Sequence, residues 1–117
     1  MPARSEYLDW LLEQLAPLGS LRSKSMFGGF GLYCDGAFFA IISDDVFYVK
    51  VDETNRPRFE KAGLLPFRYD VKDGKKHMSY YPLPESALED TEALQDWARE
   101  GIGAALRAAA KSSKKRQ

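Results

Sequence analysis

Three glycines near the start of the chain, Gly28, Gly29 and Gly31, are the first residues whose spacing could serve chemistry. They lie in the stretch SKSMFGGFGLYCDG, and two basic residues, Arg22 and Lys24, stand close before them. Glycines beside positive charge can cradle a phosphate, approach a nucleic acid, or let two backbone segments pack closely. A phosphate loop places its glycines between a strand and the start of a helix. These glycines lie inside a strand pattern that runs into a turn, so we interpret them as packing residues.

The same stretch can be compared with an RNA-binding strand. The RNP motif has the form K/R-G-F/Y-G/A-F-V-x-F/Y on a central strand. Aligned on Gly29-Phe30-Gly31, the chain has Gly28 in the basic position and Asp35 in place of the last aromatic residue. The chain also opens with a helix pattern where the second RNP strand would stand. The motif therefore does not predict an RNA-recognition domain.

Catalytic and metal-binding residue types are sparse. His77 is the only histidine and Cys34 the only cysteine, and the sequence does not place them together as base and nucleophile. Asp44 and Asp45 are adjacent, and neighbouring strand positions point to opposite faces, which disfavours an acid–base pair. The scattered carboxylates have no metal-ligand spacing. We therefore predict a protein that is not an enzyme and that binds no metal or cofactor.

Length and composition indicate one soluble domain. The 117 residues are 44% hydrophobic and 13% aromatic, which is enough to fill the core of a small domain. A single cysteine excludes an internal disulfide and suits a reducing compartment. The N-terminal sequence lacks the apolar segment of a secretion signal, and no apolar run is long enough to cross a membrane. These features predict a cytoplasmic protein without membrane contact.

Charge is unevenly distributed along the chain. The formal net charge is zero, but the last residues, KSSKKRQ, hold four basic side chains and no acidic one: Lys111, Lys114, Lys115 and Arg116. Residues 1–110 therefore have a net negative charge, unlike a dedicated DNA-binding domain. We predict a folded domain over residues 1–110 and a basic, disordered tail over residues 111–117.

Hydrophobic periodicity predicts the elements that position these residues. The expected elements are a helix over 5–16, strands over 26–34, 37–43 and 46–51, a helix from about 52 to 62, a hairpin over 67–81 and a helix from about 90 to 110. Asp35-Gly36 and Asp44-Asp45 are typical of tight hairpin turns. The order of helix, three strands, helix, two strands and helix predicts an α+β domain of two layers with an antiparallel sheet.

Aromatic residues indicate an interaction surface. Trp10 lies about 100° around the first helix from the apolar stripe, so we expect it at the edge of the buried face or outside it. Tyr80 and Tyr81 fall on opposite faces of one strand, so at least one of them could be exposed. Exposed amphipathic aromatic residues are enriched at protein interfaces. A homodimer or a partner protein could use these residues, with Trp10 as the first candidate contact.

The sequence from Arg22 onward resembles a known family. The segment RSKSMFGGFGLYCDGAFFAIISDDVFYVKVDETNRPRFEKAG, followed by MSYYPLPE, is similar to the N-terminal domain of the TfoX/Sxy family of natural-competence regulators. The similarity extends from about Leu21 to Trp97. It implies a two-layer α+β fold like that of secretion chaperones, and it supplies no catalytic residue.

The resemblance also implies a function. Family members are described as transcriptional regulators of DNA-uptake genes that act with the cyclic-AMP receptor protein, and longer members carry a second, helical domain. The first interpretation is a regulator or adaptor that binds a protein of the transcription machinery. The alternative is a weak, sequence-independent nucleic-acid-binding protein that uses Arg22, Lys24 and the basic tail.

Overall fold

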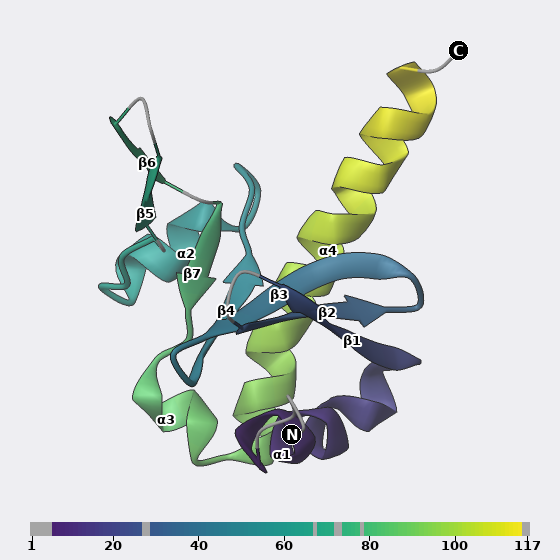
Figure 1. The fold of residues 1–117 in the computed structure, drawn as a ribbon, viewed down its shortest axis with the longest axis vertical. Helices are drawn as coiled ribbons and strands as arrows, with labels where there is room; N and C mark the ends of the chain where they lie inside the picture. The colour runs from purple at the N-terminus through teal and green to yellow at the C-terminus, as the bar shows by residue number, and fades with distance from the viewer. Residues whose placement is uncertain (1–5, 27–28, 67, 72–73, 78, 116–117) are drawn as a thin grey trace.

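A computed structural model of the chain describes residues 6–26, 29–66, 68–71, 74–77 and 79–115. It contains a five-stranded antiparallel sheet, a separate two-stranded hairpin, and helices packed against the larger sheet (Figure 1). The α+β fold class predicted from the sequence is therefore confirmed.

The elements have the following bounds. The helices are α1 (Glu6–Leu15), the 3-10 helix η1 (Ala16–Leu18), α2 (Arg56–Lys61), α3 (Glu85–Leu88) and α4 (Thr91–Lys115). The strands are β1 (Leu21–Met26), β2 (Gly29–Cys34), β3 (Ala37–Ser43), β4 (Val46–Lys50), β5 (Arg68–Val71), β6 (Gly74–His77) and β7 (Tyr80–Pro82). The larger sheet has the strand order β1-β2-β3-β4-β7, and β5 pairs with β6.

The first predicted strand corresponds to β2, and a further strand that the sequence pattern did not predict precedes it. Residues 21–26 form β1, which pairs antiparallel with β2, whereas periodicity predicts one strand over 26–34. The sequence of β1, LRSKSM, is mostly polar, so it lacks the alternation of apolar and polar residues from which a strand is predicted. As the outermost strand of the sheet it has a partner on one side only, and such a position tolerates charged residues.

The predicted tight turns are confirmed. Asp35 and Gly36 connect β2 to β3 with φ angles of 51° and 88°. Asp44 and Asp45 connect β3 to β4 with φ angles of 53° and 59°. Positive φ at both central residues is the geometry of a type I′ turn. The Asp35 carboxylate also accepts a hydrogen bond from the backbone N–H of Ser20 at 2.9 Å, which joins this turn to the start of β1.

The predicted hairpin over 67–81 is divided between the two sheets. β5 and β6 pair with each other, but Tyr80–Pro82 pairs antiparallel with β4 in the larger sheet. Tyr80 and Tyr81 face opposite sides of that sheet, as predicted, and are only 5% and 7% exposed, so neither is the exposed aromatic contact that the sequence left open. The reason is packing on both sides, because the Tyr81 ring lies against Phe59 and the Tyr80 ring against Phe38.

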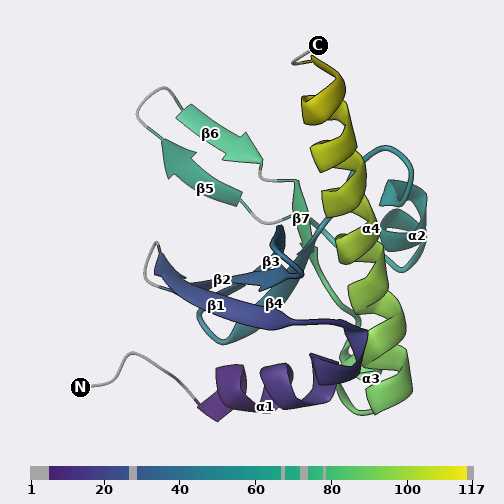
Figure 2. The same cartoon turned by 90° about the vertical axis from the view of Figure 1, so that its right-hand side faces the viewer.

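One face of the larger sheet carries the core. Figure 2 shows α1 beneath the strands and α4 along their side. In the apolar stripe of α1, Leu8, Leu11 and Leu15 are fully buried, whereas Tyr7 and Leu12 are partly buried at its margin. Its residues join a core cluster whose largest fully buried members include Leu8, Leu11, Leu15, Leu32, Phe39, Phe47, Phe59 and Leu94. This packing fixes which side of each strand faces the helices.

Gly29 explains the glycine-rich stretch in part. A side chain at this position would collide with the backbone carbonyl oxygen of Ile42 on β3, and its Cβ would lie 3.1 Å from the carbonyl carbon. The register between β2 and β3 also shifts between Leu32 and Tyr33. Gly29 therefore permits close backbone approach between two strands, which agrees with its interpretation as a packing residue.

Gly101 brings α4 close to the sheet. A Cβ at this position would lie 2.7 Å from Cβ of Val49 and 3.0 Å from the carbonyl oxygen of Phe39. Further along the same helix, a Cβ at Gly103 would meet only the guanidinium group of Arg107, at 3.4 Å. Glycine at position 101 therefore sets the distance between helix and sheet.

The last helix continues past its predicted end at Ala110 and reaches Lys115. Alanine and lysine are strong helix formers, and no glycine or proline follows Ala110 to end the helix. The helix backbone includes Lys114 and Lys115, while Arg116 lies outside the described residues. Within the part of the chain that the structure describes, no helix is long and apolar enough to cross a membrane.

Candidate functional site

The only cysteine is part of the core. Cys34 is 2% exposed, and its Sγ donates a hydrogen bond to the carbonyl oxygen of Leu18 at 3.7 Å. Burial, and then the nearby charge of Asp35, raises the pKa of the thiol, which makes it a poor nucleophile. The His77 side chain lies outside the described residues. Among the residues that are described, no group of three or more His, Cys, Asp or Glu could hold a metal ion.

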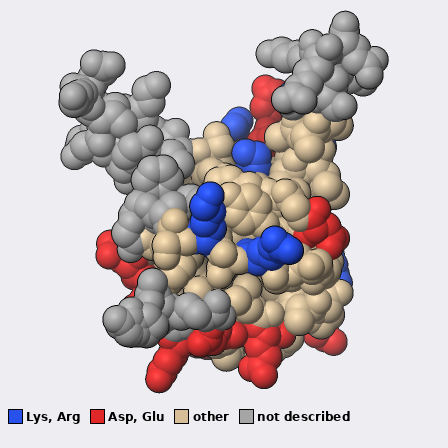
Figure 3. All heavy atoms as spheres, turned by 45° about the vertical axis from the view of Figure 1, so that its right-hand side comes forward, with Lys and Arg blue, Asp and Glu red and all other residues tan. Residues whose placement is uncertain are grey.

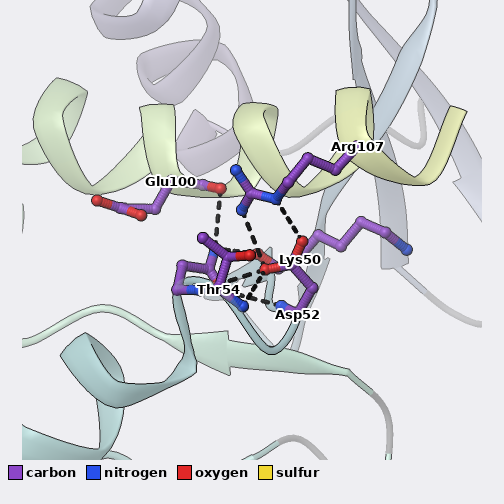
Figure 4. A network of polar contacts seen from close by, with 6 residues as sticks. Lys50, Asp52, Thr54, Glu100 and Arg107 are labelled. Carbon is purple, nitrogen blue, oxygen red and sulfur yellow. Dashed lines mark hydrogen bonds and ion pairs between the residues drawn. The ribbon is translucent and has the colours of Figure 1, made fainter. Parts of the chain in front are cut away.

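The most connected polar group lies where β4 leads into α2. Asp52 Oδ2 accepts a hydrogen bond from Arg107 Nε at 2.6 Å, and Asp52 Oδ1 accepts one from Arg107 Nη2 at 3.0 Å (Figure 4). Asp52 Oδ1 also accepts the backbone N–H groups of Thr54 and Asn55, at 3.0 and 3.2 Å. One carboxylate therefore orders the loop before α2 and binds the loop to α4.

Asn55 stands at the centre of this group and is only 4% exposed. Its Oδ1 accepts the backbone N–H of Asp52 at 2.8 Å. Its Nδ2 donates to the carbonyl oxygens of Lys50 at 3.3 Å and Glu100 at 2.9 Å. Asn55 occupies the N-cap position of α2, but its side chain does not cap that helix. It joins β4, the loop and α4 instead.

A second set of ion pairs joins α2 to α4. Arg58 binds Asp96 through Nη2 at 2.6 Å and Glu100 through Nη1 at 2.7 Å. Its guanidinium group also lies over the Trp97 ring, 4.0 Å from the ring centroid. These side chains are partly exposed, so the ion pairs contribute modestly to stability. Two charged residues of the DETNRPRF stretch, Asp52 and Arg58, thus contribute to holding the fold together.

A pocket of about 370 Å³ opens beside Asp52. Its charged lining comes from β4, the following loop, the start of α2, and α4: Lys50, Asp52, Glu53, Arg56, Arg107 and Lys111. The hydrogen bond from Arg107 lowers the pKa of Asp52, so this carboxylate is ionised at neutral pH and cannot act there as a general acid. The chemistry of the pocket is that of ion pairing.

Asp52→Asn tests the charge in this network. The Arg107 hydrogen bond and smaller contributions hold the pKa of Asp52 below its ordinary value of 3.8, against the opposing effect of burial. A lowered carboxyl pKa stabilises the fold above the unfolded pKa, and this contribution is lost as the pH falls through the folded pKa. In urea unfolding, we expect wild type to exceed Asp52→Asn in stability at neutral pH, with a gap that narrows below pH about 4. A gap that does not change with pH would show that the Asp52 charge contributes nothing.

The sheet face opposite α1 and α4 is the second candidate site. Cross-strand partners in an antiparallel sheet share a face. Arg22 pairs with Tyr33, Tyr33 pairs with Phe38, and Lys50 pairs with Tyr80. Lys24 lies on the same side as Arg22, two positions along β1. The outer sheet face is therefore defined by six residues: Arg22, Lys24, Tyr33, Phe38, Lys50 and Tyr80.

Three aromatic rings form a row across the outer sheet face. The ring centroids of Tyr33 and Phe38 lie 5.1 Å apart, and those of Phe38 and Tyr80 lie 6.0 Å apart. Tyr33 and Phe38 are half-buried, whereas Tyr80 is buried. Lys50 Nζ lies 5.5 Å from the Tyr80 ring centroid. Burial raises the pKa of Tyr80 to about 12, so its hydroxyl stays protonated at neutral pH.

Positive charge flanks this aromatic row. Arg22 and Lys24 are exposed on β1. Together with Lys50 they are the charged residues of the five strands, whose sequences contain no Asp or Glu. Figure 3 shows Lys and Arg side chains gathered in the middle of one face of the molecule and Asp and Glu side chains along its lower rim. The sequence pattern indicated Arg22 and Lys24 but not Tyr33 and Phe38, because only the pairing of β1 with β2 and of β2 with β3 brings these residues together.

The other predicted contact residues lie elsewhere. Trp10 is half-buried on α1 at the margin of the core, and its ring stacks on Tyr7 with centroids 6.0 Å apart. α1 covers the core side of the sheet, so Trp10 and the β1 cations belong to opposite sides. Lys111 is exposed near the end of α4. The structure therefore does not unite these predicted contact residues in one site.

Comparison with known proteins decides the family. Residues 13–105 match the family model described as the TfoX N-terminal domain. The chain belongs to this family. This TfoX N-terminal domain is 32% identical over 68 residues to the DNA transformation protein TfoX1 of Aliivibrio fischeri. It is 27% identical over 95 residues to Protein Sxy of Escherichia coli.

The match to TfoX1 covers 58% of this chain and 32% of TfoX1. The match to Sxy covers 81% of this chain and 46% of Sxy. The chain therefore matches less than half the length of either relative. All six residues of the outer sheet face lie inside the family match, as do Asp52 and Asn55. Trp10, Arg107 and Lys111 lie outside it.

Proposed function

We propose that this chain is a TfoX-like regulator or adaptor that acts by binding a macromolecule and affects the genes of DNA uptake. The match of residues 13–105 to the TfoX N-terminal domain carries the proposal. The name of one relative, DNA transformation protein TfoX1, supports the connection with competence. Asp52 is paired with Arg107, and Arg58 with Asp96 and Glu100, so these charges join parts of the fold, which supports action by binding and without catalysis. The proposed place of action is the cytoplasm.

The proposed partner is a protein of the transcription machinery. Support comes from an apolar surface between η1 and α4. Leu106 is 56% exposed there, and with Pro17, Leu18 and Ile102 it lines an open pocket of about 370 Å³. Exposed apolar groups of this kind commonly mark protein contacts. A partner would cover Leu106 and approach Arg99 at the rim of the same pocket.

Gene expression tests this function. The full chain is expressed in an Aliivibrio fischeri strain that lacks TfoX1, and transcripts of DNA-uptake genes are measured. The matching segment of TfoX1 serves as a control, because this chain corresponds to only 32% of that protein. We expect higher transcript levels than with an empty vector, and a smaller rise with Leu106→Asp at equal protein level. Unchanged transcripts in the presence of folded protein would contradict the proposal.

A homodimer through α1 is a further proposed assembly. The half-buried Trp10, stacked on Tyr7, would supply the apolar contact. Light scattering at micromolar concentration is expected to give about twice the chain mass of 13.2 kDa. Trp10→Ala should shift the protein toward monomer, because tryptophan is a frequent hot-spot residue. Glu13→Ala, an exposed change on the same helix, should leave the mass unchanged. A monomer at every concentration would rule out this assembly.

A further inference from the structure

We infer that the outer sheet face binds single-stranded nucleic acid, with Tyr33 and Phe38 stacking on unpaired bases and Arg22 and Lys24 contacting phosphates. This inference adds a ligand to the proposed function and does not depend on it. It rests on aromatic rings and positive charge that the pairing of five strands brings to one side of the sheet.

The aromatic row is arranged to receive bases. Tyr33 and Phe38 are half-buried, so packing fixes part of each ring while the remainder stays accessible. Their contact with each other, and that of Phe38 with Tyr80, restricts the rings before any ligand arrives. Side chains that are already ordered lose little freedom on binding. Stacking on aromatic rings is the sequence-tolerant means by which proteins hold unpaired bases.

The charges complete the match to a nucleic acid. Arg22 is the strand partner of Tyr33, so a cation and a ring stand side by side at the β1 end of the face. Lys24 continues the charge along β1, and Lys50 adds charge beside Tyr80 at the other end. A backbone of phosphates following β1 would place its bases toward the rings. Such a pairing of a basic track with stacking rings characterises single-strand binding surfaces.

The ligand is a single strand and not a duplex. In a duplex the bases stack on one another and cannot reach rings that lie within a sheet surface, whereas an unpaired strand can splay its bases. The zero net charge of the chain gives no overall attraction for a polyanion, so binding depends on the local cations. The three cations of the outer sheet face, Arg22, Lys24 and Lys50, predict that the logarithm of affinity falls against the logarithm of salt concentration with a slope of about −2 for single strands.

Fluorescence anisotropy of the full chain tests this inference. The probe is fluorescein-labelled oligothymidylate, and the comparison is the same strand annealed to oligoadenylate. We expect binding at low salt that is tighter for the single strand than for the duplex, with the salt slope given above. Tyr33→Leu and Phe38→Leu should each weaken binding on the order of tenfold, and Tyr33→Phe, which keeps the ring, should bind like wild type.

Charge variants separate the phosphate contacts. Arg22→Gln and Lys24→Gln should each reduce the magnitude of the salt slope by about 0.7. Lys61→Gln makes the same charge change at an exposed residue of α2, outside the larger sheet, and should leave binding unchanged. Thermal melting of every variant distinguishes lost contacts from lost folding.

Three results would overturn the inference. The first is no binding of oligothymidylate at low salt. The second is equal binding of duplex and single strand that Tyr33→Leu does not change, which would indicate charge alone. The third is that a full-length variant with the four C-terminal cations changed to glutamine loses binding, while Tyr33→Leu binds like wild type. This result would place the contact on the C-terminal residues. Uptake-gene expression is measured separately, so failure here is distinguishable from failure of the proposed function.

Discussion

Gly101→Ala is expected to lower the free energy of unfolding by about 2 kcal/mol. The new Cβ would lie 2.7 Å from Cβ of Val49, 3.0 Å from the Phe39 carbonyl oxygen and 3.2 Å from the Lys50 backbone nitrogen. Two of these atoms belong to the backbone of neighbouring strands, so no change of rotamer can relieve the contact. Alanine is favoured over glycine in a helix by about 1 kcal/mol, and the overpacking must exceed this gain.

Gly103→Ala is the matched control on the same helix. Its Cβ would meet only the end of the flexible Arg107 side chain, at 3.4 Å. Helix propensity should therefore decide the result, with a rise in stability of about 0.5–1 kcal/mol. Urea unfolding followed by circular dichroism measures both variants. If both alanines stabilise the protein, then α4 can move away from the sheet at little cost.

Asn55→Ala is expected to cost about 2–4 kcal/mol of stability. The asparagine is 4% exposed and its side chain makes hydrogen bonds to the backbones of Asp52, Lys50 and Glu100. Alanine would leave the Asp52 N–H and the Lys50 carbonyl group without this partner in a buried site, and an unsatisfied buried group costs about 1–3 kcal/mol. Denaturant unfolding, with the slope checked against wild type, gives the change.

Two further variants define the cause of the Asn55 effect. Thr54→Ala changes the neighbouring exposed residue and keeps its backbone N–H, so stability should stay within about 0.5 kcal/mol of wild type. Asn55→Asp keeps an acceptor for the Asp52 N–H but loses both donors. The free energy of unfolding of Asn55→Asp should therefore be lower than that of wild type. Equal stability of Asn55→Ala and Thr54→Ala would mean that water replaces the lost hydrogen bonds.

The features predicted correctly from the sequence depend on local chemistry. The first helix lies at Glu6–Leu15 because its leucines recur at helical spacing and bury one stripe. The turns at Asp35-Gly36 and Asp44-Asp45 form because these residue types tolerate positive φ. The second helix ends at Lys61, close to its predicted end, and Gly63 follows with a φ of 78°. Each of these depends on a few neighbouring residues.

The features that sequence analysis missed depend on pairing between distant segments. β1 has a polar sequence, and only its hydrogen bonds to β2 make it a strand. β7 follows β6 closely in sequence but pairs with β4. The outer sheet face could not be predicted for the same reason. Arg22 lies beside Tyr33, and Tyr33 beside Phe38, only because of the register in which the strands pair. Asn55 lies within the range of the predicted second helix, and its hydrogen bond to Glu100 of α4 has no local signal in the sequence.

The two ends of the larger sheet have a consequence for self-association. β1 presents exposed Arg22 and Lys24, and β7 is only three residues long and finishes at Pro82, which has no N–H to donate. Charge, shortness and proline are the features by which proteins resist edge-to-edge aggregation. A foreign strand would therefore find poor main-chain pairing at either end, and the sheet is protected against β-augmentation and fibril growth. Binding partners have to engage this domain through its side chains.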